Sequence, residues 1–162
     1  MGPDRRHARQ QALVGLLEAE GLDGVLVTGR ANIRYVTGFS GTAALVVVTR
    51  HDVLLVTDFR YDAQARAEAG DVARIVVERT SVWDRLFKEL PGMGPLPIVG
   101  FEAHALTVRD AARLTEQGAA WRWQQAGELV ERLRARKDAI EVARIREAAT
   151  LAGAALARER LA

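Results

Sequence analysis

The sequence places an arginine and a tyrosine directly after a strongly apolar run, in the segment Asp58-Phe59-Arg60-Tyr61. A charged pair that follows a buried strand lies at the rim of its sheet, where it can meet a ligand. The planar guanidinium recognises a carboxylate through two parallel hydrogen bonds, so we predict Arg60 as a carboxylate-binding residue. A structural alternative stays open, in which Asp58 caps the helix that begins near Tyr61, Arg60 pairs with a surface acid, and the tyrosine packs.

The other residue types that could do chemistry are isolated in the sequence. His7, His51 and His104 have no metal-binding partner three or four residues away, so we interpret them as surface or turn histidines and predict no metal site. Ser40 is followed by Thr42 at the position where a nucleophile elbow needs its second glycine. We therefore expect Ser40 to be a loop residue whose hydroxyl bonds the backbone. The sequence has no cysteine, which excludes disulfides and thiol nucleophiles.

Length and charge exclude several classes of protein. The chain has 162 residues, of which 49% are hydrophobic and 27% are charged, which suits one globular domain. Its 23 basic and 21 acidic residues are nearly balanced and dispersed, so we expect no nucleic-acid partner. No apolar run is long enough to cross a membrane, and the first residues lack the apolar stretch of an export signal. We therefore expect a cytoplasmic protein with no membrane partner.

The elements that must position these residues alternate between strands and helices. Aliphatic runs predict strands at residues 24–28, 43–49, 53–57, 73–77, 98–101 and 120–125. Helical spacing and caps predict helices at residues 4–20 and 61–69, after Ser81, and from Thr107 to about residue 117, with a helical turn at 32–36. The second and third strands should form a hairpin, and the proline- and glycine-rich residues 91–97 should be irregular. The order predicts a mixed α/β sheet covered on both faces, with Trp121 and Trp123 packed beneath a helix.

The character of the chain changes after Ala126, where strand signals end. Residues 127–137 predict one helix, and Asp138 with Glu141 has the spacing of a capping box for a second helix that runs to the end. An apolar stripe recurs along this second helix, at Val142, Ile145, Ala149, Ala152 and Leu156. Such a stripe needs a surface to pack on, so we expect the chain to be part of a longer one, with an α/β domain at 1–126 and linker helices at 127–162.

Four segments of the chain follow one another in a characteristic order. They are Asn-Ile-Arg-Tyr-Val-Thr-Gly-Phe-Ser-Gly at residues 32–41, a hairpin followed by Thr-Asp-Phe-Arg-Tyr at 57–61, residues 129–138, and Glu141 with residues 145–148. Taken in this order, they resemble the amino-terminal domain of the creatinase, prolidase and Xaa-Pro aminopeptidase family. The Xaa-Pro aminopeptidase and dipeptidase branch is the most similar. The resemblance implies a three-layer α/β fold with a mixed, roughly six-stranded sheet flanked by helices. Within residues 127–162, it implies a linker helix and then the truncated first helix of a pita-bread metallopeptidase domain, the rest of which would follow in a complete protein.

The resemblance also implies a function for this part of such a protein. The family's second domain carries two Asp, one His and two Glu that hold two divalent metals, manganese, cobalt or zinc, and hydrolyse the bond before proline. None of those motifs occurs here, so we expect no catalytic residue, no metal and no peptidase activity in this chain. The family's amino-terminal domain mediates homodimer contacts and helps to wall off the active site, and Phe59, Arg60 and Tyr61 match a segment that reaches a partner's substrate pocket.

Three alternatives stay open. The chain could be a free-standing module that binds a small carboxylate through Arg60. It could be the corresponding domain of a creatinase-like amidinohydrolase. The arginine-rich terminal helices could also bind RNA, which would show as salt-sensitive retention of oligonucleotides.

Overall fold

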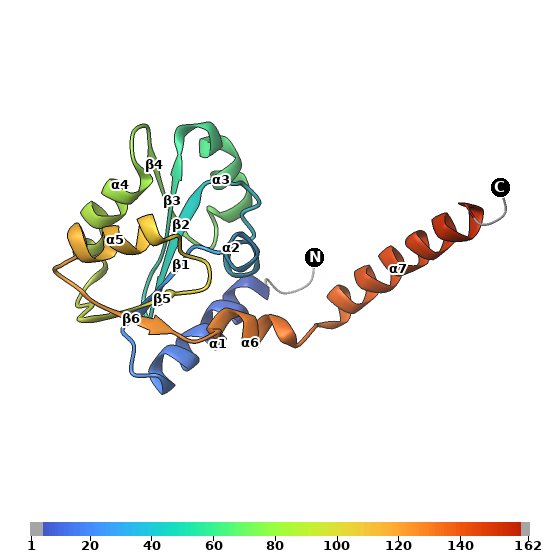
Figure 1. Cartoon of the computed structure of the whole chain (residues 1–162), viewed down its shortest axis with the longest axis horizontal. Helices are drawn as coiled ribbons and strands as arrows, with labels where there is room; N and C mark the ends of the chain where they lie inside the picture. The colour runs from blue at the N-terminus through green and yellow to red at the C-terminus, as the bar shows by residue number, and fades with distance from the viewer. Residues whose placement is uncertain (1–4, 160–162) are drawn as a thin grey trace.

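The computed structural model describes residues 5–159 and is built around one six-stranded mixed sheet with helices on both faces (Figure 1). The strands are β1 (Gly24–Val27), β2 (Ala44–Thr49), β3 (Val53–Asp58), β4 (Arg74–Glu78), β5 (Ile98–Glu102) and β6 (Arg122–Ala126). The helices are α1 (Arg5–Ala19), α2 (Arg30–Thr37), α3 (Asp62–Ala69), α4 (Val82–Glu89), α5 (Val108–Glu116), α6 (Leu129–Ala135) and α7 (Ala139–Glu159). Two short 3-10 helices, Phe59–Tyr61 and Leu90–Met93, complete the described elements.

The strand order β4-β3-β2-β1-β5-β6 decides which residues can meet. Strand β2 is antiparallel to both β1 and β3, whereas β1 with β5, β5 with β6 and β3 with β4 are parallel. Five strands therefore run in one direction, and the carboxyl ends of β1, β3 and β5 lie at the same edge of the sheet. The predicted hairpin and the predicted mixed sheet are confirmed.

Successive side chains of the central strands point to opposite faces of the sheet, and a hydrophobic core lies on each face. Val25 and Val27 join the core under α1, α2, α3 and α6, whereas Leu26 joins the core under α4 and α5. Trp121 and Trp123 pack against the second core around Phe87 of α4, with ring centroids 6.3 and 6.4 Å from the phenyl ring. The predicted packing of both tryptophans beneath a helix is confirmed.

Several predicted boundaries are wrong in ways that have local causes. Residues 91–97 were expected to be irregular, but Leu90–Met93 forms a 3-10 helix, because a proline in the first turn needs no N–H donor there. The predicted turn at 32–36 is the longer helix α2, which ends at Gly38 with a positive φ of 85°. The helix expected over 127–137 is confined to Leu129–Ala135. The domain boundary at residue 126 stays a prediction.

Helix α7 extends away from the sheet and its flanking helices (Figure 1). Of the residues in the expected stripe, Ile145 and Leu156 are 54% and 67% exposed. The apolar stripe expected from the sequence is therefore present on a helix, and it faces solvent. Among residues 5–159, no helix combines the length and the apolar character that crossing a bilayer would need.

Candidate functional site

The predicted carboxylate-binding arginine lies at the carboxyl end of β3 and already holds a carboxylate. Asp58 accepts hydrogen bonds from the Arg60 backbone N–H at 2.9 Å, from its Nε at 3.0 Å and from its Nη2 at 2.6 Å. The side-chain hydrogen bond from Arg60 lowers the pKa of Asp58. The Arg60 side chain is nevertheless 65% exposed. The structural alternative is thus present, with Asp58 capping the 3-10 helix rather than α3, and ligand binding by Arg60 stays a prediction.

The residues beside Arg60 take different environments. Phe59 is 56% exposed, whereas the Tyr61 ring packs edge-on against the buried Phe39, with centroids 5.8 Å apart and an interplanar angle of 88°. The Tyr61 hydroxyl lies 2.5 Å from Thr42 Oγ1, and this hydrogen bond lowers the pKa of Tyr61. Tyr61 therefore fixes the loop before β2, while Phe59 and Arg60 remain accessible.

Ser40 belongs to that loop, but its partner differs from the prediction. Its hydroxyl donates to the carboxylate of Glu68 at 2.8 Å rather than to the backbone, and its N–H donates to the same carboxylate at 2.7 Å. Gln64 donates to Ser40 Oγ at 2.9 Å. The loop is thereby tied to α3.

A buried carboxylate at the end of β5 organises the same edge of the sheet, and sequence reasoning missed it. Glu102 is 3% exposed, and its Oε2 accepts from the backbone N–H groups of Thr28 and Gly29, both at 2.7 Å. Its Oε1 accepts from Asn32 Nδ2 at 2.6 Å. Gly29 caps α2 without a side chain, so Glu102 supplies the negative charge that this helix N-terminus favours.

The cluster around Asn32 continues into α6. Asn32 Nδ2 also donates to Glu131 Oε1, and Arg134 Nη1 donates to Asn32 Oδ1 at 2.8 Å. Burial raises the pKa of Glu131, but the hydrogen bond from Asn32 and the nearby His104 outweigh burial and hold this pKa below its usual value. His104 Nε2 lies 3.0 Å from Glu131 Oε1. His104 is exposed and lies in a turn, as the sequence predicts, and it also contacts Glu131, a residue distant in the chain.

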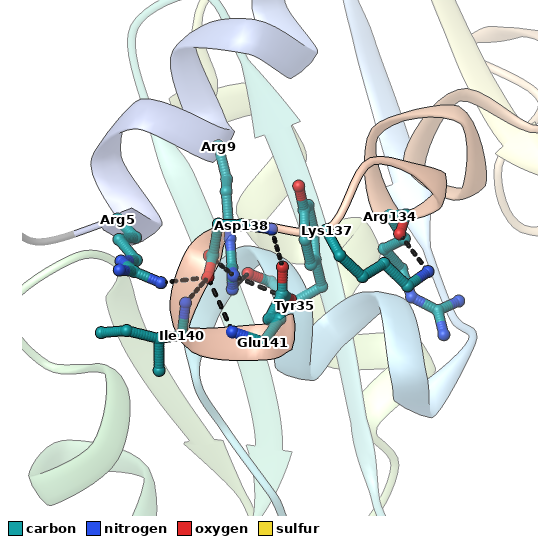
Figure 2. Close-up of polar contacts among 8 residues, drawn as sticks. All are labelled: Arg5, Arg9, Tyr35, Arg134, Lys137, Asp138, Ile140 and Glu141. Carbon is teal, nitrogen blue, oxygen red and sulfur yellow. Dashed lines mark hydrogen bonds and ion pairs between the residues drawn. The ribbon is translucent and has the colours of Figure 1, made fainter. Parts of the chain in front are cut away.

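A second cluster joins the start of α1 to the start of α7 (Figure 2). The predicted capping box is confirmed, since Asp138 Oδ1 accepts from the Glu141 N–H at 2.8 Å and Glu141 Oε2 accepts from the Asp138 N–H at 3.0 Å. Arg5 pairs with Asp138, and Arg9 Nη2 reaches Asp138 at 3.3 Å and Glu141 at 3.1 Å. The hydrogen bond from the Glu141 backbone and the Arg5 guanidinium lower the pKa of Asp138 to about 2.

Arg9 also fixes the neighbouring helix. Its guanidinium carbon lies 4.1 Å from the centroid of the Tyr35 ring, and its Nη1 donates to the Tyr35 carbonyl at 3.2 Å. Burial raises the pKa of the Tyr35 hydroxyl. The arrangement can position α7 relative to α1 and α2.

Among residues 5–159, no group of three or more His, Asp or Glu side chains is placed to hold a metal ion.

Comparison with known proteins finds a family model and solved structures that are similar to this chain. The Creatinase/Prolidase N-terminal domain model matches residues 9–136. The chain is 29% identical to the Xaa-Pro dipeptidase from Bacillus anthracis, with a TM-score of 0.88 over 94% of this chain and 42% of that protein. It is 33% identical to the N-terminal domain of cytoplasmic peptidase PepQ from Mycobacterium tuberculosis H37Rv, with a TM-score of 0.70 over 78% of this chain and 98% of that one.

A curated relative gives the same result at the sequence level. Uncharacterized peptidase YqhT from Bacillus subtilis (strain 168) is 31% identical over 132 residues, which cover 82% of this chain and 37% of that protein. The chain thus spans less than half the length of the B. subtilis and B. anthracis proteins. The family model, the six-stranded mixed sheet and the resemblance of residues 32–41 and 57–61 agree, and the chain belongs to the creatinase/prolidase N-terminal domain family.

Proposed function

We propose that this chain is the amino-terminal part of a metal-dependent Xaa-Pro peptidase, in which it supports homodimer assembly and walls off the active site. The observation that carries the proposal is the match to the B. anthracis Xaa-Pro dipeptidase, which covers 94% of this chain and 42% of that protein. The peptidase names of the relatives favour this function over a creatinase-like amidinohydrolase.

The chemistry of bond cleavage is assigned to the rest of the longer protein. A two-metal centre needs five carboxylate and imidazole ligands brought together, and the side chains of residues 5–159 do not fit one. Manganese, cobalt or zinc would therefore be held outside this part of the chain. The contribution of this domain is to shape the surroundings of the site.

Phe59 and Arg60 are the residues proposed to contact a substrate in a neighbouring subunit, with Tyr61 holding their segment in place. They follow β3 directly, and an exposed phenyl ring and guanidinium can be presented to another protein. An incoming carboxylate would have to compete with Asp58 for the guanidinium group of Arg60. This competition disfavours the alternative of a free-standing carboxylate-binding module, because the isolated chain satisfies Arg60 internally.

Helix α7 supports the same proposal through its exposed apolar face. Ile145 and Leu156 are more than half exposed, and further chain of the longer protein is their proposed packing partner. The similarity to a cytoplasmic peptidase supports a cytoplasmic location for that protein.

The test uses the longer protein and a charge-matched control. In the homodimer, Arg60→Gln should lower kcat/KM for an Xaa-Pro dipeptide by about tenfold, the cost of one lost charged hydrogen bond. Arg109→Gln changes an exposed arginine on α5 and should leave kcat/KM unchanged. Equal activities of the two variants would rule out the role of Arg60, and a strictly monomeric active enzyme would rule out the role in assembly.

A further inference from the structure

A concave groove lined by arginines lies where helices α1, α2, α6 and α7 approach one another. Its volume is about 710 Å³, and Glu141 is the one acidic residue among its lining residues, all of which lie in the described part of the chain. The arginines in the lining are Arg5, Arg9, Arg30, Arg34, Arg134 and Arg144. Whereas the whole sequence is nearly balanced, with 23 basic and 21 acidic residues, this groove concentrates positive charge.

Three of the six arginines are already neutralised or hydrogen-bonded. Figure 2 shows Arg5 and Arg9 directed at the capping box of α7, where they pair with Asp138, and Arg9 also pairs with Glu141. Arg134 donates to Asn32 Oδ1 at 2.8 Å. These contacts hold the first turn of α7 near α1, and this turn thereby forms one wall of the groove.

The other three arginines have no such partner. The side chains of Arg30, Arg34 and Arg144 make no hydrogen bond or ion pair with any residue in the range 5–159. Arg34 acts electrostatically on Glu68, whose carboxylate is already bonded by Ser40. Arg30 and Arg34 are four residues apart on α2 and so share a face, while Arg144 comes from α7. Unpaired guanidinium groups from two helices therefore surround one cavity.

The shape of the groove restricts what it can take. A volume of about 710 Å³ lies within the range of small-molecule sites, roughly 300–1,000 Å³. Small lining residues, Ala31, Gly38 and Gly41, leave room beside the arginines. A nucleic-acid surface instead needs a basic stripe that extends along the protein. Arginine binds carboxylate and phosphate groups through two parallel hydrogen bonds, and several arginines in a concavity favour several negative charges.

We propose that this groove binds a compact polyanion that carries two or more carboxylate or phosphate groups. Arg30 and Arg34 hold one end of the ligand and Arg144 the other, so the ligand bridges α2 and α7. This binding is separate from peptide hydrolysis and from the role of Arg60.

The test measures binding to this chain by calorimetry at low ionic strength, with pyrophosphate and citrate as probes. Acetate is the monoanion control, and tetraglutamate represents an acidic peptide. We expect saturable binding of pyrophosphate, citrate or both, and none of acetate. Arg34→Gln and Arg144→Gln should each weaken binding by about tenfold, because each removes a charged hydrogen-bond donor. Arg109→Gln is the control, since Arg109 is an exposed arginine on α5.

Each outcome bears on the proposal. Binding of citrate alone assigns a polycarboxylate, and binding of pyrophosphate alone assigns a phosphate compound. The proposal is overturned by no saturable heat with either probe, by binding of tetraglutamate only, or by equal weakening in all three variants. Parental affinity in both Arg34→Gln and Arg144→Gln also overturns it. Both residues are exposed, and circular dichroism of each variant checks that its fold is unchanged.

Discussion

Replacing Glu102 by glutamine should destabilise the domain strongly even though the two side chains have the same shape. The carboxylate is 3% exposed and accepts four hydrogen bonds, from the N–H groups of Thr28 and Gly29, from the Thr28 hydroxyl at 3.4 Å and from Asn32 Nδ2. A glutamine must turn its NH₂ group either toward the two backbone donors or toward Asn32. Asn32 cannot turn its amide to compensate, because Arg134 already donates to Asn32 Oδ1 at 2.8 Å.

The expected loss follows from these contacts. In the better orientation, the glutamine turns its NH₂ group toward Asn32. The hydrogen bond from Asn32 Nδ2 to a charged acceptor is then lost and two donor groups face each other, which costs about 1.5–3 kcal/mol. The two bonds from Thr28 and Gly29 lose their charge assistance, which costs roughly a further 0.5 kcal/mol each. The free energy of unfolding should therefore fall by about 3 kcal/mol. With a urea m-value of about 2 kcal/mol/M, the unfolding midpoint should fall by about 1.5 M.

Urea unfolding followed by circular dichroism measures this difference at pH 7. Glu116→Gln is the matched control, because Glu116 is exposed at the end of α5 and accepts no hydrogen bond within residues 5–159. This control should change stability by no more than about 0.5 kcal/mol. If Glu102→Gln and Glu116→Gln unfold at the same urea concentration, Glu102 does not hold the β1, β5 and α2 junction together.

Three further predictions test other parts of the structure. Because folding lowers the pKa of Asp138, the contribution of this carboxylate to stability is complete above its unfolded pKa near 3.8 and is lost as the pH falls toward about 2. An NMR titration of the Asp138 carboxyl should therefore show a midpoint near 2. Phe39 is fully buried and Phe59 is 56% exposed, so Phe39→Ala should cost about 3–5 kcal/mol in unfolding experiments and Phe59→Ala no more than about 0.5 kcal/mol. Because the apolar face of α7 is exposed, sedimentation velocity should show concentration-dependent association of the chain, and Ile145→Glu with Leu156→Glu should reduce it; identical profiles would contradict a role of this face.

The parts of the fold that sequence reasoning predicted depend on neighbours close in the chain. Ser81 Oγ accepts from the Asp84 N–H at 3.2 Å and Thr107 Oγ1 accepts from the Asp110 N–H at 3.1 Å, as their spacing predicts. The hairpin, likewise, joins strands that are separated by a turn of three residues. Such features need only local geometry, so they can be recognised before the sheet order is known.

The Glu102 cluster could not be predicted in this way, because its members are distant in the chain. Glu102 meets Thr28 across 74 residues, and Asn32 meets Glu131 across 99. These contacts depend on β5 lying next to β1, which the order of elements along the chain does not reveal. A usable signal was present: a lone glutamate ends an apolar strand, and the residue before α2 is a glycine, which has no capping side chain.

The contacts of the candidate site also divide into local ones, which the sequence predicts, and distant ones, which it does not. The alternative in which Asp58 caps a helix and Arg60 pairs with an acid was anticipated, although not that the two residues pair with each other, whereas the contact of Arg9 with Asp138 spans 129 residues and was not anticipated. The role proposed for Phe59, Arg60 and Tyr61 comes from the family resemblance. Their exposure or packing in a single chain cannot supply it, because that role needs a second subunit.

Hydrolysis of an Xaa-Pro dipeptide by two purified proteins, assayed side by side with Mn²⁺, decides whether this domain is a non-catalytic part of a peptidase. One protein is residues 1–162 alone, and the other is the polypeptide encoded by the whole reading frame that contains them. We expect no turnover above a metal-only blank from residues 1–162 and sustained release of proline from the longer protein. Turnover by residues 1–162 alone, or a longer protein that leaves the dipeptide intact, would contradict the account.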